Sequence, residues 1–339
     1  MSAGSGIFGN AHPLKQHLTQ SHGLAAEVQD VRNDISKAFR GAAAIAVDEW
    51  TNLPGLTAPG AAVLLAATAT VASVVTLLPA GLLAAGLAML AAWPRQLTFT
   101  TAGTTPSDAP ANVVITGLDE HGLAASETLV LAQTATIVTS VKSYSSITSI
   151  VYPAADGTGA TVSIGIAAAN IKAAFAPTVA PLTLLASQLN TKGLLNRPSQ
   201  LVFTTAGTTA SDAPANVVIT GFDINGNRQS ETLALAQTAT TATSTKYYAA
   251  IESLAFAAAD GAGSTIAITF SANVGLSRKV LLRTGAATLI RELMDGTAPT
   301  AGALIVPATA IPNGAYTPNT AGNDVHDYMV MYEYDATVP

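Results

Sequence analysis

Two pairs of acidic residues are the side chains whose spacing could support catalysis. Asp119 and Glu127 stand eight positions apart, and Asp223 and Glu231 repeat that spacing. Two carboxyl groups held about 5–10 Å apart can act together on a glycosidic bond. Each pair, however, begins in a sequence typical of a tight turn, where an Asp side chain accepts backbone N–H groups. We therefore expect structural carboxylates, no catalytic residue and no enzymatic activity.

The histidines are the next candidates, as metal ligands. The first three follow one another at intervals of five residues, which does not match the i, i+4 spacing of a helical zinc pair. The chain has no Cys, so thiolate sites and disulfides are excluded. The Asp-Gly turns offer too few oxygens for Ca²⁺. We predict no metal site and no cofactor. The five histidines are His12, His17, His22, His121 and His326.

The elements that carry the acidic pairs occur twice. Residues 97–166 and 201–270 align without a gap at an offset of 104 positions, so that Glu127 matches Glu231. A duplicated scaffold repeats its structural residues automatically, which again favours a structural role for the acidic pairs. The repeat predicts two tandem modules.

Each copy consists of short β-rich segments separated by turn residues. About 70 residues with five or more strands predict a small β-sandwich or barrel. In the first copy the expected strands are Gln96–Thr101, Asn112–Gly117, Ser126–Ala132, Ile147–Tyr152 and Thr161–Ile166.

The end of the chain alternates clearly. Tyr328, Val330, Tyr332 and Tyr334 share one face of a predicted strand, which would complete a sheet in this subunit or in another. The predicted fold class is mainly β: two duplicated modules, a C-terminal β segment and a helical N-terminal region. The predicted domains are 1–94, 95–170, a connector 171–198, 199–273 and 274–339.

The N-terminal region differs in character from the copies. Residues 1–20 are expected to form an extended arm, and an apolar stripe at helical spacing predicts an amphipathic helix over 21–40. The helix could pack on its own body or on a partner subunit. From Thr51 to Pro94 no residue is charged. This stretch is long enough for a membrane span, but Pro79 and the spread hydroxyl groups argue against one, and we expect an interface segment.

Charged residues make up 11% of the 339 residues, less than half the usual share of about 25%. A surface so poor in charge is typical of a subunit that contacts other protein, although Thr and Ser can also solvate a β-rich surface. The net charge of −6 and the lack of a basic cluster exclude general nucleic-acid binding. The predicted contact residues are Leu24, Val28, Val31, Ile35, Leu64, Leu65, Val74, Val75, Leu82, Leu83, Tyr328 and Tyr332.

The motifs resemble a family of tailed-bacteriophage virion structural proteins. They run from a "VITG-x-D-x-x-G" hairpin and a "SETL" strand in each copy to "VGLSRK", "MDGTAPTAGALIV" and a terminal "DYMVMYEY". The resemblance covers about residues 95–168 and 199–335, and the chain departs from it in its first 90 or so residues and in the duplication.

The resemblance implies a β-rich capsid-decoration (cement) or tail-associated protein without catalytic residues. Its partners would be other virion proteins, above all the major capsid protein, and its place would be the virion, assembled in the host cytoplasm. A homo-oligomer is implied, with trimers common among decoration proteins.

These observations favour a capsid-decoration subunit that acts by contact. The alternatives are a tail, baseplate or fibre component and, in another class, a carbohydrate- or receptor-binding module. Against the last, neither copy contains a Trp to stack on a sugar, since Trp50 and Trp93 lie outside the copies. If the N-terminal region makes the contacts, deleting residues 1–94 should leave folded modules that no longer enter particles.

Overall fold

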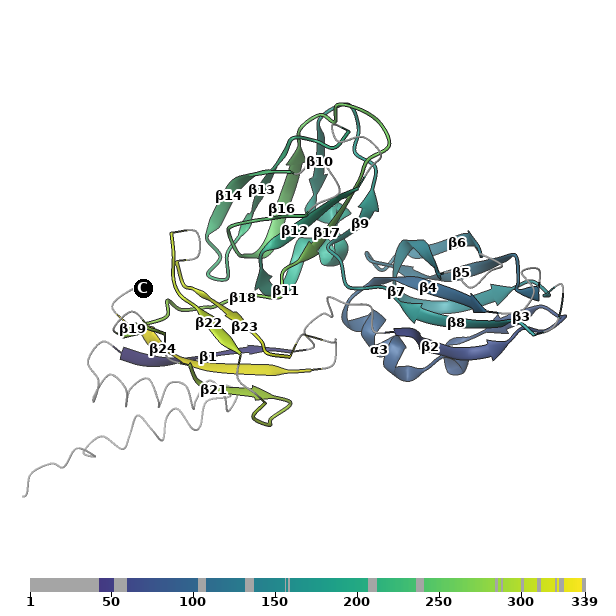
Figure 1. The fold of residues 1–339 in the computed structure, drawn as a ribbon, viewed down its shortest axis with the longest axis horizontal. Coiled ribbons are helices and arrows are strands. Elements are labelled where there is room, and N and C mark those ends of the chain that lie inside the picture. Colours follow the sequence, from purple (N-terminus) through teal and green to yellow (C-terminus); the bar gives the residue numbers. More distant parts are fainter. Residues whose placement is uncertain are drawn as a thin grey trace, which may run out of the picture.

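The chain is mainly β, as the sequence predicts. In the described residues, antiparallel sheets dominate and α3 (Ala84–Ala92) is the α-helix (Figure 1). The predicted arm and the predicted helix over 21–40 lie outside these residues. The computed structural model describes residues 43–51, 60–102, 108–131, 137–155, 157, 159–206, 212–235, 241–283, 286–287, 289–299, 302–309, 312–320, 322 and 326–336.

The first and last strands of the described chain lie side by side in what we call the base. Strand β1 pairs antiparallel with β24, Ala43 opposite Asp335 and Trp50 opposite Tyr328, and β21 flanks β24 on its other edge (Figure 1). The alternating C-terminal strand thus completes a sheet of its own subunit. The strands of the base are β1 (Ala43–Trp50), β18 (Val274–Gly275), β19 (Leu282–Arg283), β20 (Ala286–Ala287), β21 (Leu289–Met294), β22 (Ala303–Ile305), β23 (Ala315–Thr317) and β24 (Tyr328–Asp335).

A buried carboxylate ties β1 to the rest of the base. Asp48 accepts hydrogen bonds from the backbone N–H of Ser277 at 3.0 Å, from the Ser277 hydroxyl, and from the Tyr332 hydroxyl at 3.0 Å. Burial raises the pKa of Asp48, and these hydrogen bonds together with Arg278 oppose that rise. The network joins residues more than 220 positions apart.

We call residues 60–166, the first copy together with the strands before it, repeat one, and residues 172–270, likewise extended, repeat two. Repeat one forms a single sheet in the order β2-β8-β4-β7-β5-β6, with β3 also paired to β7. Strand β7 is 16 residues long: its first part pairs with β4 and its second part with β5, so it bends across the module. Its strands are β2 (Gly60–Ala69), β3 (Val75–Leu77), β4 (Arg95–Ala102), β5 (Asn112–Asp119), β6 (Ala124–Val130), β7 (Ile137–Tyr152) and β8 (Thr161–Ile166), with the 3₁₀ turn η1 (Pro79–Gly81) before α3.

Repeat two builds the same pairings from two sheets, β15-β12-β17-β9 and β10-β16-β13-β14, because residues 244–247 separate β15 from β16. One core cluster draws side chains from both sheets. Its strands are β9 (Lys172–Phe175), β10 (Leu182–Leu185), β11 (Leu194–Ser199), β12 (Leu201–Ala206), β13 (Asn216–Phe222), β14 (Arg228–Ala234), β15 (Thr241–Thr243), β16 (Tyr248–Phe256) and β17 (Thr265–Phe270), with 3₁₀ turns η3 (Ala186–Gln188) and η4 (Asn190–Gly193).

Two segments that we expected to be an interface segment (within 51–94) and a connector (171–198) contribute strands to the repeats. In repeat one, β2 pairs with β8 and β3 with β7; in repeat two, β9 pairs with β17 and β10 with β16. The physical reason is that each sheet edge needs a partner for its backbone groups, and the preceding apolar segment supplies it. The region 1–94 is likewise divided, with β1 in the base and residues 60–92 in repeat one.

The pairings also reveal a shift in the alignment of the repeats. Val75 lies opposite Tyr152, and Leu182 lies opposite Phe256. Tyr152 and Phe256 are 104 positions apart, but Val75 and Leu182 are 107 apart. The segment that follows β10 in repeat two is therefore three residues shorter than the segment that follows β3 in repeat one. It contains the 3₁₀ turns η3 and η4, whereas the segment in repeat one contains α3.

The motif glycine of "VITG" is explained by a β-bulge. Strand β5 changes register against β7 between Thr116 and Gly117. A Cβ at Gly117 would lie 2.1 Å from the Ser146 carbonyl oxygen, and one at the matching Gly221 would lie 2.3 Å from that of Ala250. Glycine is required because the neighbouring backbone occupies the space of a side chain.

A tryptophan joins the two repeats. Trp93 follows α3, but its buried side chain belongs to the core of repeat two. Its ring packs edge-on against Phe270 at 5.2 Å between centroids, and its Nε1 donates to the Asn170 carbonyl at 2.9 Å. The repeats are thus packed against each other rather than merely linked.

Candidate protein-contact surface

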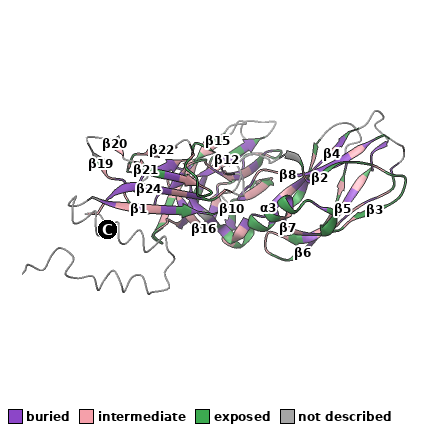
Figure 2. Cartoon of the chain, turned by 90° about the horizontal axis from the view of Figure 1, so that it is seen from below, coloured by how far each residue is buried: buried purple, intermediate pink, exposed green. Residues whose placement is uncertain are grey.

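The predicted contact residues have different fates in the structure. Leu24, Val28, Val31 and Ile35 lie outside the described residues. Leu64 and Leu82 are buried in the core of repeat one, and Tyr328 and Tyr332 in the core of the base. These four side chains are therefore occupied within their own chain. Figure 2 shows the alternation behind this result, with buried and exposed residues interleaved along the strands and exposed residues on α3.

The remaining predicted residues lie at the surface of repeat one. Val74 is 65% exposed and Leu83 47% exposed, while Leu65 and Val75 are half-buried. Sequence reasoning missed two neighbours, Val71 and Leu78, which are also exposed. We call these six residues the β2–β3 surface: Leu65, Val71, Val74, Val75, Leu78 and Leu83. All six side chains are apolar, and the stretch from Thr51 to Pro94 that contains them has no charged residue.

A second group of exposed apolar side chains lies on other strands of repeat one. Leu123, Val130, Ile137 and Val141 come from β6, the hairpin before it and the first part of β7, and each is more than 60% exposed. The matching positions of repeat two are exposed as well, yet they hold Asn227, Ala234, Thr241 and Thr245. The scaffold and the exposure are the same, so the scaffold itself does not require apolar residues here. Exposed apolar residues beyond what a fold needs are typical of protein contacts.

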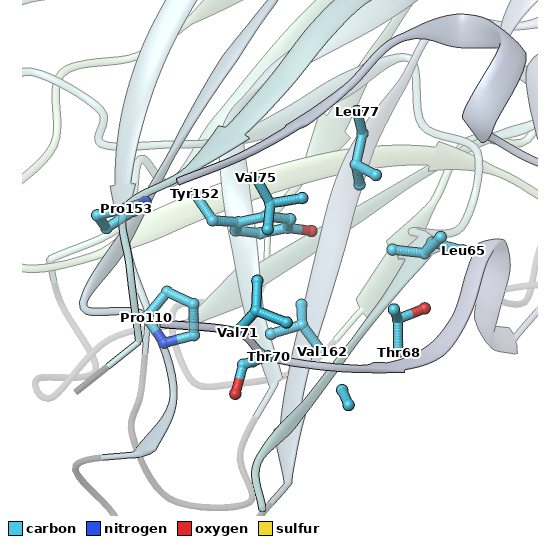
Figure 3. Close-up of a pocket in the computed structure, with 11 residues that line it drawn as sticks. Leu65, Thr68, Thr70, Val71, Val75, Leu77, Pro110, Tyr152, Pro153 and Val162 are labelled. Carbon is cyan, nitrogen blue, oxygen red and sulfur yellow. The ribbon is translucent and has the colours of Figure 1, made fainter. Parts of the chain in front are cut away.

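A small apolar pocket opens beside the β2–β3 surface (Figure 3). It encloses about 350 Å³ of space, part of it open to solvent. In Figure 3 the Tyr152 ring lies between Val71 and Val75, and its hydroxyl points toward Leu65 and Leu77. Among the described residues this buried hydroxyl has no hydrogen-bond partner, and burial raises the pKa of the Tyr152 phenol. The lining residues are Leu65, Thr68, Ala69, Thr70, Val71, Val75, Leu77, Pro110, Tyr152, Pro153 and Val162.

The acidic residues that could support catalysis are held by backbone groups. Asp119 accepts from the N–H groups of His121 and Leu123 at 2.8 and 2.9 Å, which closes the hairpin. Glu127 accepts from the N–H groups of Val141 and Lys142 at 3.1 and 2.9 Å. Repeat two copies both arrangements with Asp223 and Glu231. In each pair, the Asp thus stabilises a hairpin turn and the Glu binds two backbone amides of the neighbouring strand segment, so the spacing of eight residues has a structural origin.

The histidines fall into two groups. His12, His17 and His22 lie outside the described residues, His121 stands in the hairpin, and His326 contacts Asp295 with its Nδ1 at 2.5 Å from the carboxylate. Within the part of the chain that the structure describes, no three metal-ligating side chains come together. In the same part of the chain, no helix has the length and apolarity to cross a membrane.

A polar cleft lies between the repeats. It is lined by the β5–β6 hairpin and β7 on one side and by β9 on the other, and it encloses about 870 Å³ of space, part of it open to solvent. Its charged side chains are Asp119, Glu120, Lys142 and Lys172, and neither Trp50 nor Trp93 lines it.

Comparisons with known proteins give little. No protein-family model matches the chain, and no curated protein sequence matches it significantly. Among solved structures, the PBSX exported protein XepA matches with a TM-score of 0.21 and 9% identity, over 62% of this chain and 87% of that one. The infectious bursal disease virus VP2 subviral particle matches with a TM-score of 0.12 and 10% identity, over 86% and 79%.

Proposed function

We propose that this chain is a structural protein of a tailed-phage virion that decorates the capsid and stabilises it through protein contacts. Its two repeats would be duplicated β-sandwich modules, with repeat one making the main contact. The motif resemblance supports the class of protein, and the low charge supports a contact role.

One observation carries the contact role of repeat one. Four exposed positions of a duplicated scaffold hold Leu123, Val130, Ile137 and Val141 in repeat one and polar or small residues in repeat two. Burying such side chains contributes roughly 25 cal/mol per Å² of apolar area. A subunit can therefore bind a shell tightly through such a face without any active site.

The internal duplication supplies the test. A variant with Leu123→Asn, Val130→Ala, Ile137→Thr and Val141→Thr carries residues that the same scaffold already accepts in repeat two. We expect it to fold and melt like the parent but to be lost from purified particles. The reverse four substitutions in repeat two are the matched control and should leave incorporation unchanged. Normal incorporation of the first variant would overturn the contact role of these four positions of repeat one.

The location of the chain in the virion needs a separate measurement. Gold labelling of a tagged chain, imaged on intact particles, should mark the head and leave the tail bare. Label on the tail would instead establish the alternative, a tail, baseplate or fibre component. Light scattering of the free chain gives its oligomeric state, for which we propose a closed homo-oligomer.

A carbohydrate-binding function is the competitor from another class, and the polar cleft between the repeats is its best location. A glycan array probed with the full chain decides the matter. Saturable binding that Lys172→Ala abolishes would favour that function over decoration.

A further inference from the structure

The pocket of repeat one has a filled counterpart in repeat two. Thr68 lies opposite Val162 in the β2–β8 pair, and Phe175 lies opposite Ile266 in the β9–β17 pair. Val162 and Ile266 are matching positions of the two repeats. Phe175 therefore stands in repeat two where Thr68 lines the pocket of repeat one. Leu65 with Ile164 and Lys172 with Ile268 give the same correspondence.

An aromatic ring closes the site in repeat two. The rings of Phe175 and Phe256 meet edge-on at 5.7 Å between centroids, and Phe256 meets Phe203 at 6.2 Å. In repeat one Tyr152 replaces Phe256, but Thr68 is too short to reach across it. The pocket is the space that a phenyl ring occupies in the other repeat.

The tyrosine adds a polar requirement. Repeat two manages with Phe256 at this position, whereas repeat one buries a hydroxyl that has no partner among the described residues. Leaving a buried donor unpaired costs about 1–3 kcal/mol. A ligand that carries a hydrogen-bond acceptor beside its ring would remove this cost.

The surroundings of the pocket indicate that the ring belongs to a protein. Val71, Val74 and Leu78 are 45%, 65% and 57% exposed in the same stretch of chain. A free small molecule would leave them in water, whereas a partner protein would cover them together with the pocket. One ring alone buries far less than the roughly 800 Å² per partner of a stable interface, so it would act as an anchor within a larger contact.

We propose that this pocket receives one aromatic side chain, a Phe or Tyr of the neighbouring virion subunit, in the place that Phe175 fills within repeat two. The inference rests on the proposed function for the identity of the partner, but not for the chemistry of the pocket. Tyr is the better fit, because its hydroxyl oxygen can accept from Tyr152.

The chemistry of the pocket is tested with toluene and p-cresol, which mimic Phe and Tyr side chains. Methyl NMR of the full chain should show shifts at Val71, Val75 and Val162 when either probe is added. Thr68→Phe should fill the pocket in cis and abolish these shifts while the chain stays folded. Phe175→Thr is the matched control and should open a second site, with new shifts at Leu182 and Ile266. Probe binding to Thr68→Phe at parental affinity, or no binding to the parent, would overturn the proposal.

The role of the hydroxyl has its own variant. In the parent, p-cresol should bind about fivefold more tightly than toluene, as one additional hydrogen bond gives. Tyr152→Phe should keep toluene binding and lose this preference. An unchanged preference would show that the hydroxyl does not contact the ligand.

Incorporation into particles then tests the aromatic anchor separately from the proposed virion function. Thr68→Phe should fold but enter particles less than the parent, and excess p-cresol should lower incorporation of the parent in the same way. If Thr68→Phe blocks the probes yet incorporates normally, the anchor is wrong and the proposed function stands. If the parent itself is absent from particles, the proposed function fails, and the NMR experiment still decides whether the pocket takes an aromatic ring.

Discussion

At the scale of single residues, Asp48 is a buried carboxylate of the base whose ionisation is opposed by burial. Its three hydrogen bonds come from Ser277 and Tyr332, and burial still raises its pKa. A carboxyl whose pKa is higher in the folded than in the unfolded state contributes most below its unfolded pKa, and this contribution is lost as the pH rises through the folded pKa.

We therefore expect Asp48→Asn to keep the network and to be more stable relative to the parent as the pH rises from 4 to 7. Asp48→Ala should lose about 2–4 kcal/mol at pH 4, because it leaves buried donors unpaired, and less at pH 7, because the parent itself loses stability as Asp48 ionises. Hydrogen exchange of the β1 amides measures both effects. A stability difference between the parent and Asp48→Asn that stays constant with pH would contradict the assignment.

The bulge glycine gives a sharper prediction. Gly117→Ala places a Cβ 2.1 Å from the Ser146 carbonyl oxygen, so we expect a loss of at least about 3 kcal/mol, comparable to severe overpacking. Gly122→Ala is the control: its φ is +76°, but no atom lies within 4 Å of the new Cβ, and the cost should be about 1 kcal/mol. Thermal melts of the two variants should differ clearly; equal melting temperatures would refute the bulge explanation.

Residue-scale inference from the sequence succeeded where chemistry is local. The Asp119 and Asp223 turns were predicted because Asx side chains bond their own backbone, and the structure confirms these bonds. Leu64 and Leu82 could not be separated from exposed Leu83, since this segment carries no charged residue to mark its outer face. The pocket could not be predicted for another reason. The gapless alignment at 104 positions concealed the three-residue shift that makes Thr68 the counterpart of Phe175.

At the scale of elements, the sequence located all five expected strands of the first copy, as β4 to β8. It missed β2, because a run of Ala and Leu lacks the period-two pattern of a half-buried strand, and β3, because three residues are too few to show that pattern. It also missed the first part of β7, where Ser and Thr obscure the alternation. Pairing with a distant edge decides such segments, and that information is not local.

Glu127 connects β6 to the first part of β7. Its carboxylate brackets the amides of Val141 and Lys142, and the Lys142 ammonium donates to the Ser126 carbonyl at 2.8 Å. Removing the bracket with Glu127→Ala should speed hydrogen exchange of these two amides about tenfold, as the loss of roughly 1.4 kcal/mol of hydrogen bonding implies. The exposed neighbour Thr128→Ala serves as control. Unchanged exchange in Glu127→Ala would show that the bracket does not protect the edge.

At the scale of the whole molecule, the structure shows that a shorter deletion than 1–94 is needed to test the N-terminal region. Deleting residues 1–94 would strip β1 from β24 and both β2 and β3 from repeat one. We expect that variant to misfold. Deleting residues 1–42 removes no described strand and should leave the melting temperature unchanged. Light scattering of this shorter deletion then reports whether the first 42 residues hold subunits together; a chain that unfolds without them would refute this division.

The pairing of β1 with β24 also has a mechanical consequence. Ala43 and Asp335 face each other at one end of the ladder, so tension applied between the two chain termini pulls the strands apart from that end. The ladder bonds would then break one after another, as in a zipper, rather than all sharing the load as they do under shear. The base should yield at low force, and the repeats, which lie between the two strands in the chain, would bear no tension until it has opened.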